Sequence, residues 1–187
     1  MGIALADAAA EYGAIVDLVL GPVNVKPASP SINVTNVTNA ASMAKACISL
    51  FPGCDIAILS AAVADFTPVV VKDRKIKKSK EELQLKLKLK PTTDIAAALG
   101  KMKRSGQFLA GFALETDNEL ENAMKKLVAK NLDIIVLNSL KEEGAGFGYD
   151  TNKITLIDRN NIIDKFELKS KEEAAKDILN KIVSMIQ

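Results

Sequence analysis

The chain has 187 residues, which suits one substantial α/β domain, and a net charge of +2 gives no basis for a nucleic-acid or membrane partner. It contains no histidine, which excludes Ser-His and Cys-His nucleophile pairs, histidine-ligated zinc and histidine general bases. No apolar run approaches the roughly 20 residues that cross a bilayer, and the first ten residues lack the basic start of a secretory signal. The two cysteines, Cys47 and Cys54, fit no zinc spacing and indicate a cytoplasmic protein. Catalysis must therefore use lysines, carboxylates, amides, backbone N–H groups or a cation held by oxygen atoms.

Segments with helical and strand-like patterns alternate along the chain, which predicts an α/β fold with a mainly parallel, doubly wound sheet. Asn39 is expected to cap the second helix, and Ser170 with Glu173 forms a capping box at the start of the last one. We predict helices at 2–12, 41–51, 94–103, 119–130 and from 171 onward, and strands at 14–21, 32–37, 55–63, 108–115, 133–139, 153–158 and 161–168.

Residues 66–90 interrupt this alternation within a single domain that spans 1–187. The first part is basic and non-periodic, whereas 83–90 alternates strictly, with period two, between leucine and a polar residue that is glutamine or lysine. The alternation predicts a half-exposed strand, so 66–90 is interpreted as a basic flap followed by that strand. Its core-facing side chains would be Leu83, Leu85, Leu87 and Leu89, and its solvent-facing ones Lys86, Lys88 and Lys90.

Three predicted strand ends carry residues suited to ligand binding: 60–65, 111–116 and 138–139. In doubly wound folds ligands bind at the carboxyl ends of the strands. Small residues before Asp65 let a ligand approach the backbone, and the Asp65 carboxylate could face a phosphate-bound Mg²⁺ or a ribose. A helix cap or a turn would explain the same aspartate.

The lysines are open to two interpretations each. Lys75 begins a basic run that could act on a phosphoryl group, or that could be a solvated loop. Nucleic-acid binding is disfavoured, because few aromatic residues are interleaved among these basic residues. Lys126 and Lys130 share one helix face, which solvation alone would explain. Glycines 144, 146 and 148 precede a strand rather than a helix, so a connecting loop is favoured over a phosphate cradle.

One ordered series of motifs resembles a known family. AAVADF at 61–66, KIKK at 75–78, TDI at 93–95, GFALET at 111–116 and KLVAKNLDIIVLN at 126–138 follow MGIALADAA and precede SKEEAAKDIL. The series resembles phosphopantothenoylcysteine synthetase, the carboxyl-terminal domain of the bacterial bifunctional flavoprotein of coenzyme A biosynthesis, over essentially the whole chain. The resemblance implies a Rossmann-like fold and a CTP-dependent ligation of 4'-phosphopantothenate to cysteine through an acyl-cytidylate.

The resemblance also implies the site residues and the partners. Lys75 would be catalytic, Asp65 would contact the nucleotide or a Mg²⁺ held with its phosphates, and Phe112 would pack on the nucleotide. The remaining nucleotide contacts would be Ser60, Ala61, Thr93, Asp94, Ile95, Ala96, Lys126 and Lys130. The family implies a homodimer, and the flavin belongs to a decarboxylase half, upstream or on a separate chain, so no flavin is expected here.

The start of the chain departs from the family pattern. A strand and a turn with an important asparagine precede the helix in the family, whereas here Gly2 opens the helix directly. We therefore expect an N-terminally incomplete domain that lacks a central strand. The alternative to an active ligase is a truncated, inactive module for nucleotide binding or dimerisation. A generic dinucleotide oxidoreductase would need a glycine-rich turn before the first helix, and the sequence has none there.

Overall fold

The computed structural model describes residues 1–76, 86–115, 117–139 and 149–187, which form a mixed α/β fold with a five-stranded central sheet. The strand order is β10-β9-β7-β6-β3, and β3, β6 and β7 run parallel, while β9 and β10 are antiparallel to their neighbours. Their bounds are β3 (Ile56–Leu59), β6 (Phe108–Glu115), β7 (Ile134–Ser139), β9 (Ile154–Asp158) and β10 (Ile163–Lys165).

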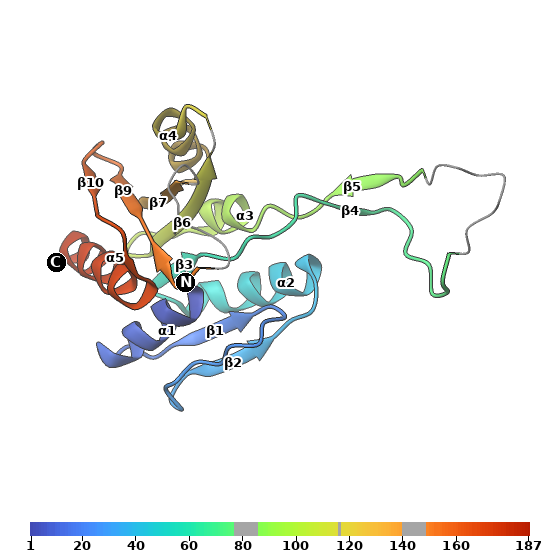
Figure 1. Cartoon of the computed structure of the whole chain (residues 1–187), viewed down its shortest axis with the longest axis horizontal. Coiled ribbons are helices and arrows are strands. Elements are labelled where there is room, and N and C mark those ends of the chain that lie inside the picture. Colours follow the sequence, from blue (N-terminus) through green and yellow to red (C-terminus); the bar gives the residue numbers. More distant parts are fainter. Residues whose placement is uncertain (77–85, 116, 140–148) are drawn as a thin grey trace.

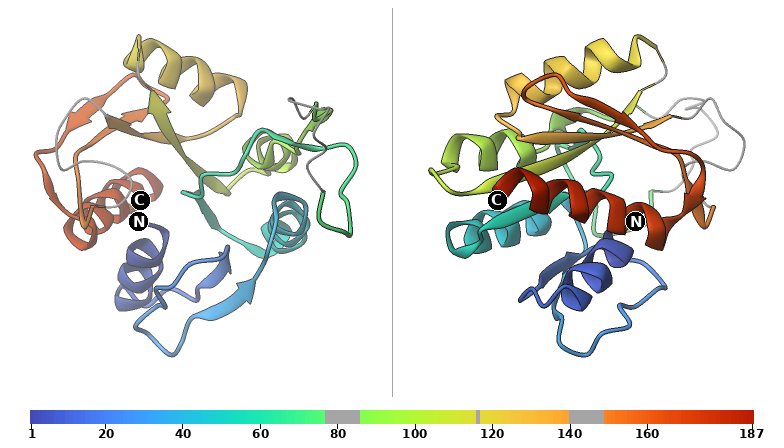
Figure 2. Two further views of the ribbon diagram at one scale, coloured as in Figure 1. Left: turned by 45° about the vertical axis from the view of Figure 1, so that its right-hand side comes forward. Right: turned by 90° about the vertical axis from the view of Figure 1, so that its left-hand side faces the viewer.

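Helices cover both faces of this sheet (Figures 1 and 2). On one face, α1 (Gly2–Glu11) and α5 (Lys171–Ile186) pack on a core that includes Ile134 and Val136. On the other face, α2 (Ala40–Leu50), a 3₁₀ turn (Phe51–Gly53), α3 (Ile95–Met102) and α4 (Glu119–Ala129) pack around Leu109 and Ile135. Alternate residues of β6 and β7 therefore enter two separate apolar cores, as expected for buried parallel strands.

Smaller strand pairs lie beside the central sheet. β1 (Asp17–Leu20) and β2 (Asn33–Asn36) form a separate parallel pair, and β8 (Thr151–Asn152) pairs antiparallel with β11 (Lys169–Ser170). Asn39 caps α2 and Ser170 with Glu173 forms a capping box at the start of α5, so both cap predictions are confirmed. Among the described residues, no helix is both long and apolar enough to span a bilayer.

A long arm extends from the body of the molecule between β3 and α3 (Figure 1). Its described base is an antiparallel ribbon of β4 (Phe66–Pro68) and β5 (Leu89–Pro91), in which Thr67 pairs with Lys90. Several apolar side chains of the arm are exposed to solvent in the single chain: Phe66, Val69, Val70, Val71, Ile76, Leu87 and Leu89. A two-stranded ribbon with such a surface has no core of its own.

Three sequence predictions are corrected by this fold. Leu87 and Leu89 were predicted to face a core, but they are 58% and 54% exposed, because no described sheet or helix covers them; Leu83 and Leu85 lie outside the described residues. The predicted strand 55–63 ends at Leu59, since the chain then turns into the arm. Thr151 and Asn152 were assigned to a loop, but they form β8 through pairing with β11, which is distant in sequence.

Gly100 allows α3 to approach the end of α4 closely. A Cβ built on Gly100 would lie 1.9 Å from the backbone oxygen of Lys130, and Asn131 Nδ2 donates to Gly100 O at 2.7 Å. We expect Gly100→Ala to lower the free energy of unfolding by about 2 kcal/mol, because the backbone of one helix must move. Urea denaturation followed by circular dichroism measures the change. Gly53→Ala is the matched control, since its Cβ would meet no atom within 4 Å; equal losses in the two variants would refute the argument.

Candidate functional site

The first turn of α3 lies at the carboxyl edge of the central sheet and carries four of the predicted nucleotide contacts. Asp94 caps the helix by accepting a hydrogen bond from the Ala97 N–H at 3.0 Å, and Thr93, Ile95 and Ala96 flank it. Lys130, the C-cap residue of α4, places its Nζ 3.0 Å from Asp94 Oδ2. Burial raises the pKa of Asp94, but the Ala97 N–H and Lys130 outweigh that effect, so the pKa lies below its ordinary value. The turn thus combines N–H groups suited to anions with a lysine and a carboxylate.

The end of β6 contributes a second lysine–carboxylate pair. Lys126 Nζ lies 2.5 Å from Glu115 Oε1, and the Glu115 side chain is only 13% exposed whereas that of Lys126 is 44% exposed. Oε1 has no aligned hydrogen bond among the described residues, so the contact is an ion pair. Because α4 supplies both lysines and their carboxylates come from β6 and α3, the two pairs bring three elements to one edge of the sheet.

Asp65 lies at the root of the arm beside the start of α3. The Thr92 N–H donates to the backbone oxygen of Asp65 at 2.9 Å, and the Thr92 hydroxyl donates to that of Ala64 at 2.7 Å. These bonds hold the exposed Asp65 beside Thr92, the residue that directly precedes Thr93 and Asp94. Asp65, Thr93, Asp94, Ile95, Ala96 and Lys130 are therefore brought together, with Lys126 reaching the same edge from α4.

Ser60, Ala61 and Phe112 lie apart from the lysine pairs. Phe112 packs against the core shared with α1 and α5, which is the sheet face opposite α4. Ser60 follows β3 and lies against the start of α1, because a Cβ built on Gly2 would lie 2.8 Å from Ser60 Oγ. Ala61 is the next residue and is exposed. The predicted nucleotide residues thus form two groups at one sheet edge, separated by the thickness of the sheet.

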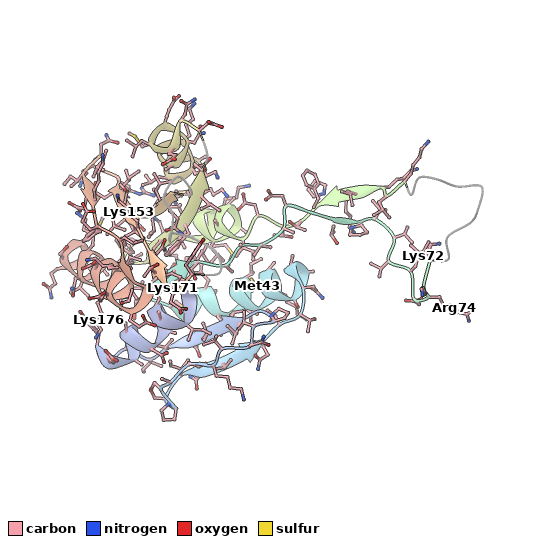
Figure 3. All side chains as sticks on the ribbon, viewed as in Figure 1. Met43, Lys72, Arg74, Lys153, Lys171 and Lys176 are labelled. Atoms are coloured by element: carbon pink, nitrogen blue, oxygen red, sulfur yellow. The ribbon has the colours of Figure 1, made fainter. Side chains whose placement is uncertain are left out.

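Lys75 is not brought to this edge within the chain. It is exposed on the distal part of the arm, near Lys72 and Arg74, which Figure 3 places far from the body. A shallow hollow lined by residues 72–76 lies there as well, away from α3 and α4. Lys77 and Lys78 of the predicted basic run, and the glycines 144, 146 and 148, lie outside the described residues.

Two residues with a place at the site were missed by sequence reasoning. Glu115 was included in the strand-end motif 111–116, but no role was predicted for it, because no sequence spacing links it to Lys126 eleven positions later. Asn152 is 2% exposed, and its Nδ2 donates to Asn138 Oδ1 at 3.2 Å at the end of β7. The Oδ1 of Asn152 has no partner among the described residues. Its importance depends on the β8–β11 pairing, which no local pattern predicts.

The cysteines fit the interpretation as small, partly buried side chains. Burial raises the pKa of both the Cys47 and the Cys54 thiol above its ordinary value, so neither is predisposed to form a thiolate. Neither residue lies in the group around α3 and α4 that carries the lysines. Nucleophilic thiol chemistry therefore has no support at this sheet edge.

The family comparison matches almost the entire chain. Residues 1–186 fit the family described as the DNA/pantothenate metabolism flavoprotein C-terminal domain. The chain belongs to this family. Two curated relatives are a coenzyme A biosynthesis bifunctional protein CoaBC from Bacillus subtilis and a cysteine/cysteine sulfinic acid decarboxylase from an unknown prokaryotic organism. The first is 43% identical over 99% of this chain and the second 60% identical over 100% of it. The chain spans about half the length of these relatives, 45% and 51% respectively.

Solved structures share the fold of this family member. A crystal structure of the C-terminal domain of CoaBC superposes with a TM-score of 0.81 at 34% identity, and the match covers 99% of this chain and 81% of that one. A DNA/pantothenate metabolism flavoprotein from Streptococcus pneumoniae gives a TM-score of 0.80 at 22% identity, over 97% of this chain and 86% of that one. The chain is therefore close in sequence and structure to the phosphopantothenoylcysteine synthetase domain of bacterial CoaBC, as the motif series predicts.

Asp94 has separable roles as a helix cap and as an ion-pair partner. We expect Asp94→Ala to lower the free energy of unfolding by about 1 kcal/mol, because the Ala97 N–H loses its acceptor. Asp94→Asn keeps a capping oxygen and loses only the half-exposed ion pair with Lys130, so its loss should be about 0.5 kcal/mol or less. Urea titrations of both variants at neutral pH measure these values, and a larger loss in Asp94→Asn than in Asp94→Ala would contradict the capping role.

Proposed function

We propose that this domain ligates 4'-phosphopantothenate to cysteine at the expense of CTP, through an acyl-cytidylate. Family membership supports a ligase of coenzyme A biosynthesis. The observation that carries the proposal is the convergence of Asp65, the α3 N-terminus and the two α4 lysines at one sheet edge. N–H groups and ammonium groups together suit a triphosphate.

The proposed reaction has two steps. A carboxylate oxygen of phosphopantothenate attacks the α-phosphorus of CTP, and the bond to the leaving pyrophosphate breaks. The amine of cysteine then attacks the acyl carbon, loses a proton, and expels CMP to leave an amide. The first nucleophile is already an anion and needs no histidine to activate it, so in that step the protein's contribution is positioning and charge stabilisation.

The described residues fit a Mg²⁺ that arrives with the nucleotide. Asp65 is an exposed carboxylate beside the α3 N-terminus, and within the described ranges no group of three or more acidic or cysteine side chains gathers to hold a metal. Mg²⁺ is commonly bound through one or two carboxylates together with substrate phosphates. Asp65 would hold the ion, and the ion would neutralise charge on the triphosphate. Asp65 would otherwise contact the nucleotide directly.

The arm supports a homodimer. Its exposed apolar side chains, including Val70 and Val71 at 64% and 76%, are covered by nothing else in the described part of the chain. A second copy of the chain is the proposed cover. In that arrangement Lys75 would lie against the sheet edge of one of the two copies and act on the charge that develops at phosphorus. Within one copy Lys75 is exposed next to Arg74, which lies on the arm far from the body (Figure 3).

The parallel pair β1–β2 and the parallel strands β3, β6 and β7 of the central sheet support a Rossmann-like order completed by one further strand. Among the described strands, β1 has β2 as its only neighbour and β3 has β6 as its only neighbour, so one edge of each is unpaired. A parallel strand from sequence outside these 187 residues would join them in the order β2-β1-strand-β3-β6. The same longer protein, or a separate chain, would supply a decarboxylase domain. If ligation requires that strand, the 187 residues alone would form the alternative, an inactive nucleotide-binding or dimerisation module.

The decarboxylase name of one relative does not extend to this domain. That name describes a protein about twice as long, of which this chain matches 51%. Release of CO₂ from cysteine, measured beside the ligase assay, would be the result that favours the decarboxylase instead.

The test of the ligase proposal is pyrophosphate release from CTP with Mg²⁺, phosphopantothenate and cysteine, each omitted in turn. We expect release to require phosphopantothenate, and CMP and the amide to accumulate once cysteine is added. A second preparation that is extended upstream by one strand and turn should be at least as active. Activity only in the extended protein would identify the present chain as the inactive module, and release that does not depend on phosphopantothenate would contradict the ligase in both.

Lys75 gives a sharper test of the arm. Lys75→Gln should leave CTP affinity within about twofold and lower turnover by roughly 100-fold, because its proposed contact forms only in the transition state. Calorimetric titration with CTP and the pyrophosphate assay measure the two quantities separately. Lys72→Gln, on the same exposed part of the arm, is the matched control and should change neither. Parallel loss of affinity and turnover in Lys75→Gln would contradict the role.

A further inference from the structure

Both lysines that α4 contributes to the sheet edge are already paired with carboxylates from other elements. Lys126 Nζ lies 2.5 Å from Glu115 Oε1 at the end of β6, and Lys130 Nζ lies 3.0 Å from Asp94 Oδ2 at the start of α3. Two cations thus face two anions. A polyphosphate that binds these lysines must therefore compete with carboxylates that the fold has placed there.

The Glu115 pair is asymmetric in burial. The Glu115 side chain is 13% exposed, whereas the Lys126 side chain is 44% exposed. The Lys126 ammonium is carried on a flexible chain of four carbons. Lys126 can therefore turn toward a new anion in solvent, but Glu115 cannot follow it. A carboxylate left behind in a poorly solvated position without its cation is unfavourable. This penalty draws Lys126 back as soon as the bound anion leaves.

A second ion pair on α4 shows what an ordinary surface pair looks like in this chain. Lys125 Nζ lies 2.6 Å from Glu121 Oε1 four residues earlier, and both side chains are well exposed, at 68% and 64%. Both partners belong to one helix turn, so the pair needs no tertiary structure. Glu115, in contrast, is positioned by the β6–β7 pairing, in which it lies opposite Ser139.

We propose that Glu115 is an internal competing anion for Lys126. It is a positioning residue that holds the ammonium at the sheet edge in the free protein, weakens the binding of polyphosphate and accelerates its release. The inference rests on the proposed function, because it gives that function's pyrophosphate product a built-in route out. The inference requires less than the full ligase reaction, since it requires only that a polyphosphate binds at Lys126.

The experiment measures the affinity of the full chain for inorganic pyrophosphate and tripolyphosphate by calorimetry. We expect Glu115→Gln to bind both about tenfold more tightly, because the Lys126 ammonium is then no longer held by a partly buried carboxylate and is free to pair with the phosphates. Glu121→Gln is the matched control and should change the affinity less than about twofold, since its charge is solvated and screened. Circular dichroism establishes that each variant is folded.

A double-mutant cycle tests whether the effect acts through Lys126. The gain in affinity from Glu115→Gln should vanish when Lys126→Gln is already present, because no cation remains to be released. Glu115→Asp keeps the charge and draws it back by one methylene, so it should give a smaller gain and serves if the glutamine variant fails to fold. Unchanged or weaker polyphosphate binding in a folded Glu115→Gln protein would overturn the proposal, as would the absence of binding by every form.

Turnover separates this inference from the ligase proposal. If the ligase assay succeeds, Glu115→Gln should lower both KM for CTP and kcat, because substrate binds and pyrophosphate leaves more slowly. A merely structural role would raise KM while lowering kcat. If the ligase assay fails and the tenfold gain in pyrophosphate affinity is still measured, the ligase proposal falls and the competing anion stands.

Discussion

The parallel pairing of β6 with β7 is the constraint on which the rest of the structure depends. Both strands are covered on both faces, and the residues at their centre are at most 1% exposed: Leu109, Ala110, Ile134, Ile135 and Val136. Because alternate side chains enter two different cores, α3 and α4 are fixed on one face and α1 and α5 on the other. The carboxyl end of β6 and the N-terminus of α3 then meet at one edge, which places Glu115 and Asp94 within reach of α4.

The two ends of this strand pair use ion pairs in different ways. At the amino end, Asp133 accepts hydrogen bonds from the Leu109 N–H at 2.7 Å and from Lys103 Nζ at 2.8 Å, and the Lys103 side chain is only 9% exposed. That cluster is tied to the backbone on which the strand register depends. At the carboxyl end, the lysines are 30% and 44% exposed, and neither donates to backbone among the described residues. The ion pair at the amino end is thus part of the backbone hydrogen bonding, whereas the lysines at the carboxyl end can exchange partners.

The sequence was sufficient for the elements whose stability is local or whose strands are buried. The caps at Asn39 and Ser170 depend on residues three positions apart, and β6 is an uninterrupted apolar run. It was insufficient where pairing joins distant segments: β8 forms only against β11, and the Leu87 and Leu89 alternation points to a core that the chain itself does not provide. At the site, helix spacing correctly put Lys126 and Lys130 on one face, but the carboxylates they meet are set by tertiary packing.

The separation of Lys75 from the other site residues has a consequence for how binding and chemistry are divided. The sheet edge holds N–H groups and two lysines without the arm, so the proposed anion binding would need only the body. A ribbon whose apolar side chains are exposed cannot hold a lysine at a fixed point, because a two-stranded ribbon in water is marginally stable. Precise placement of Lys75 must therefore come from whatever covers the arm. In the proposed reaction, a cation that arrives only with that cover would contribute little to ground-state binding, and its charge would be available for the step in which phosphorus is attacked.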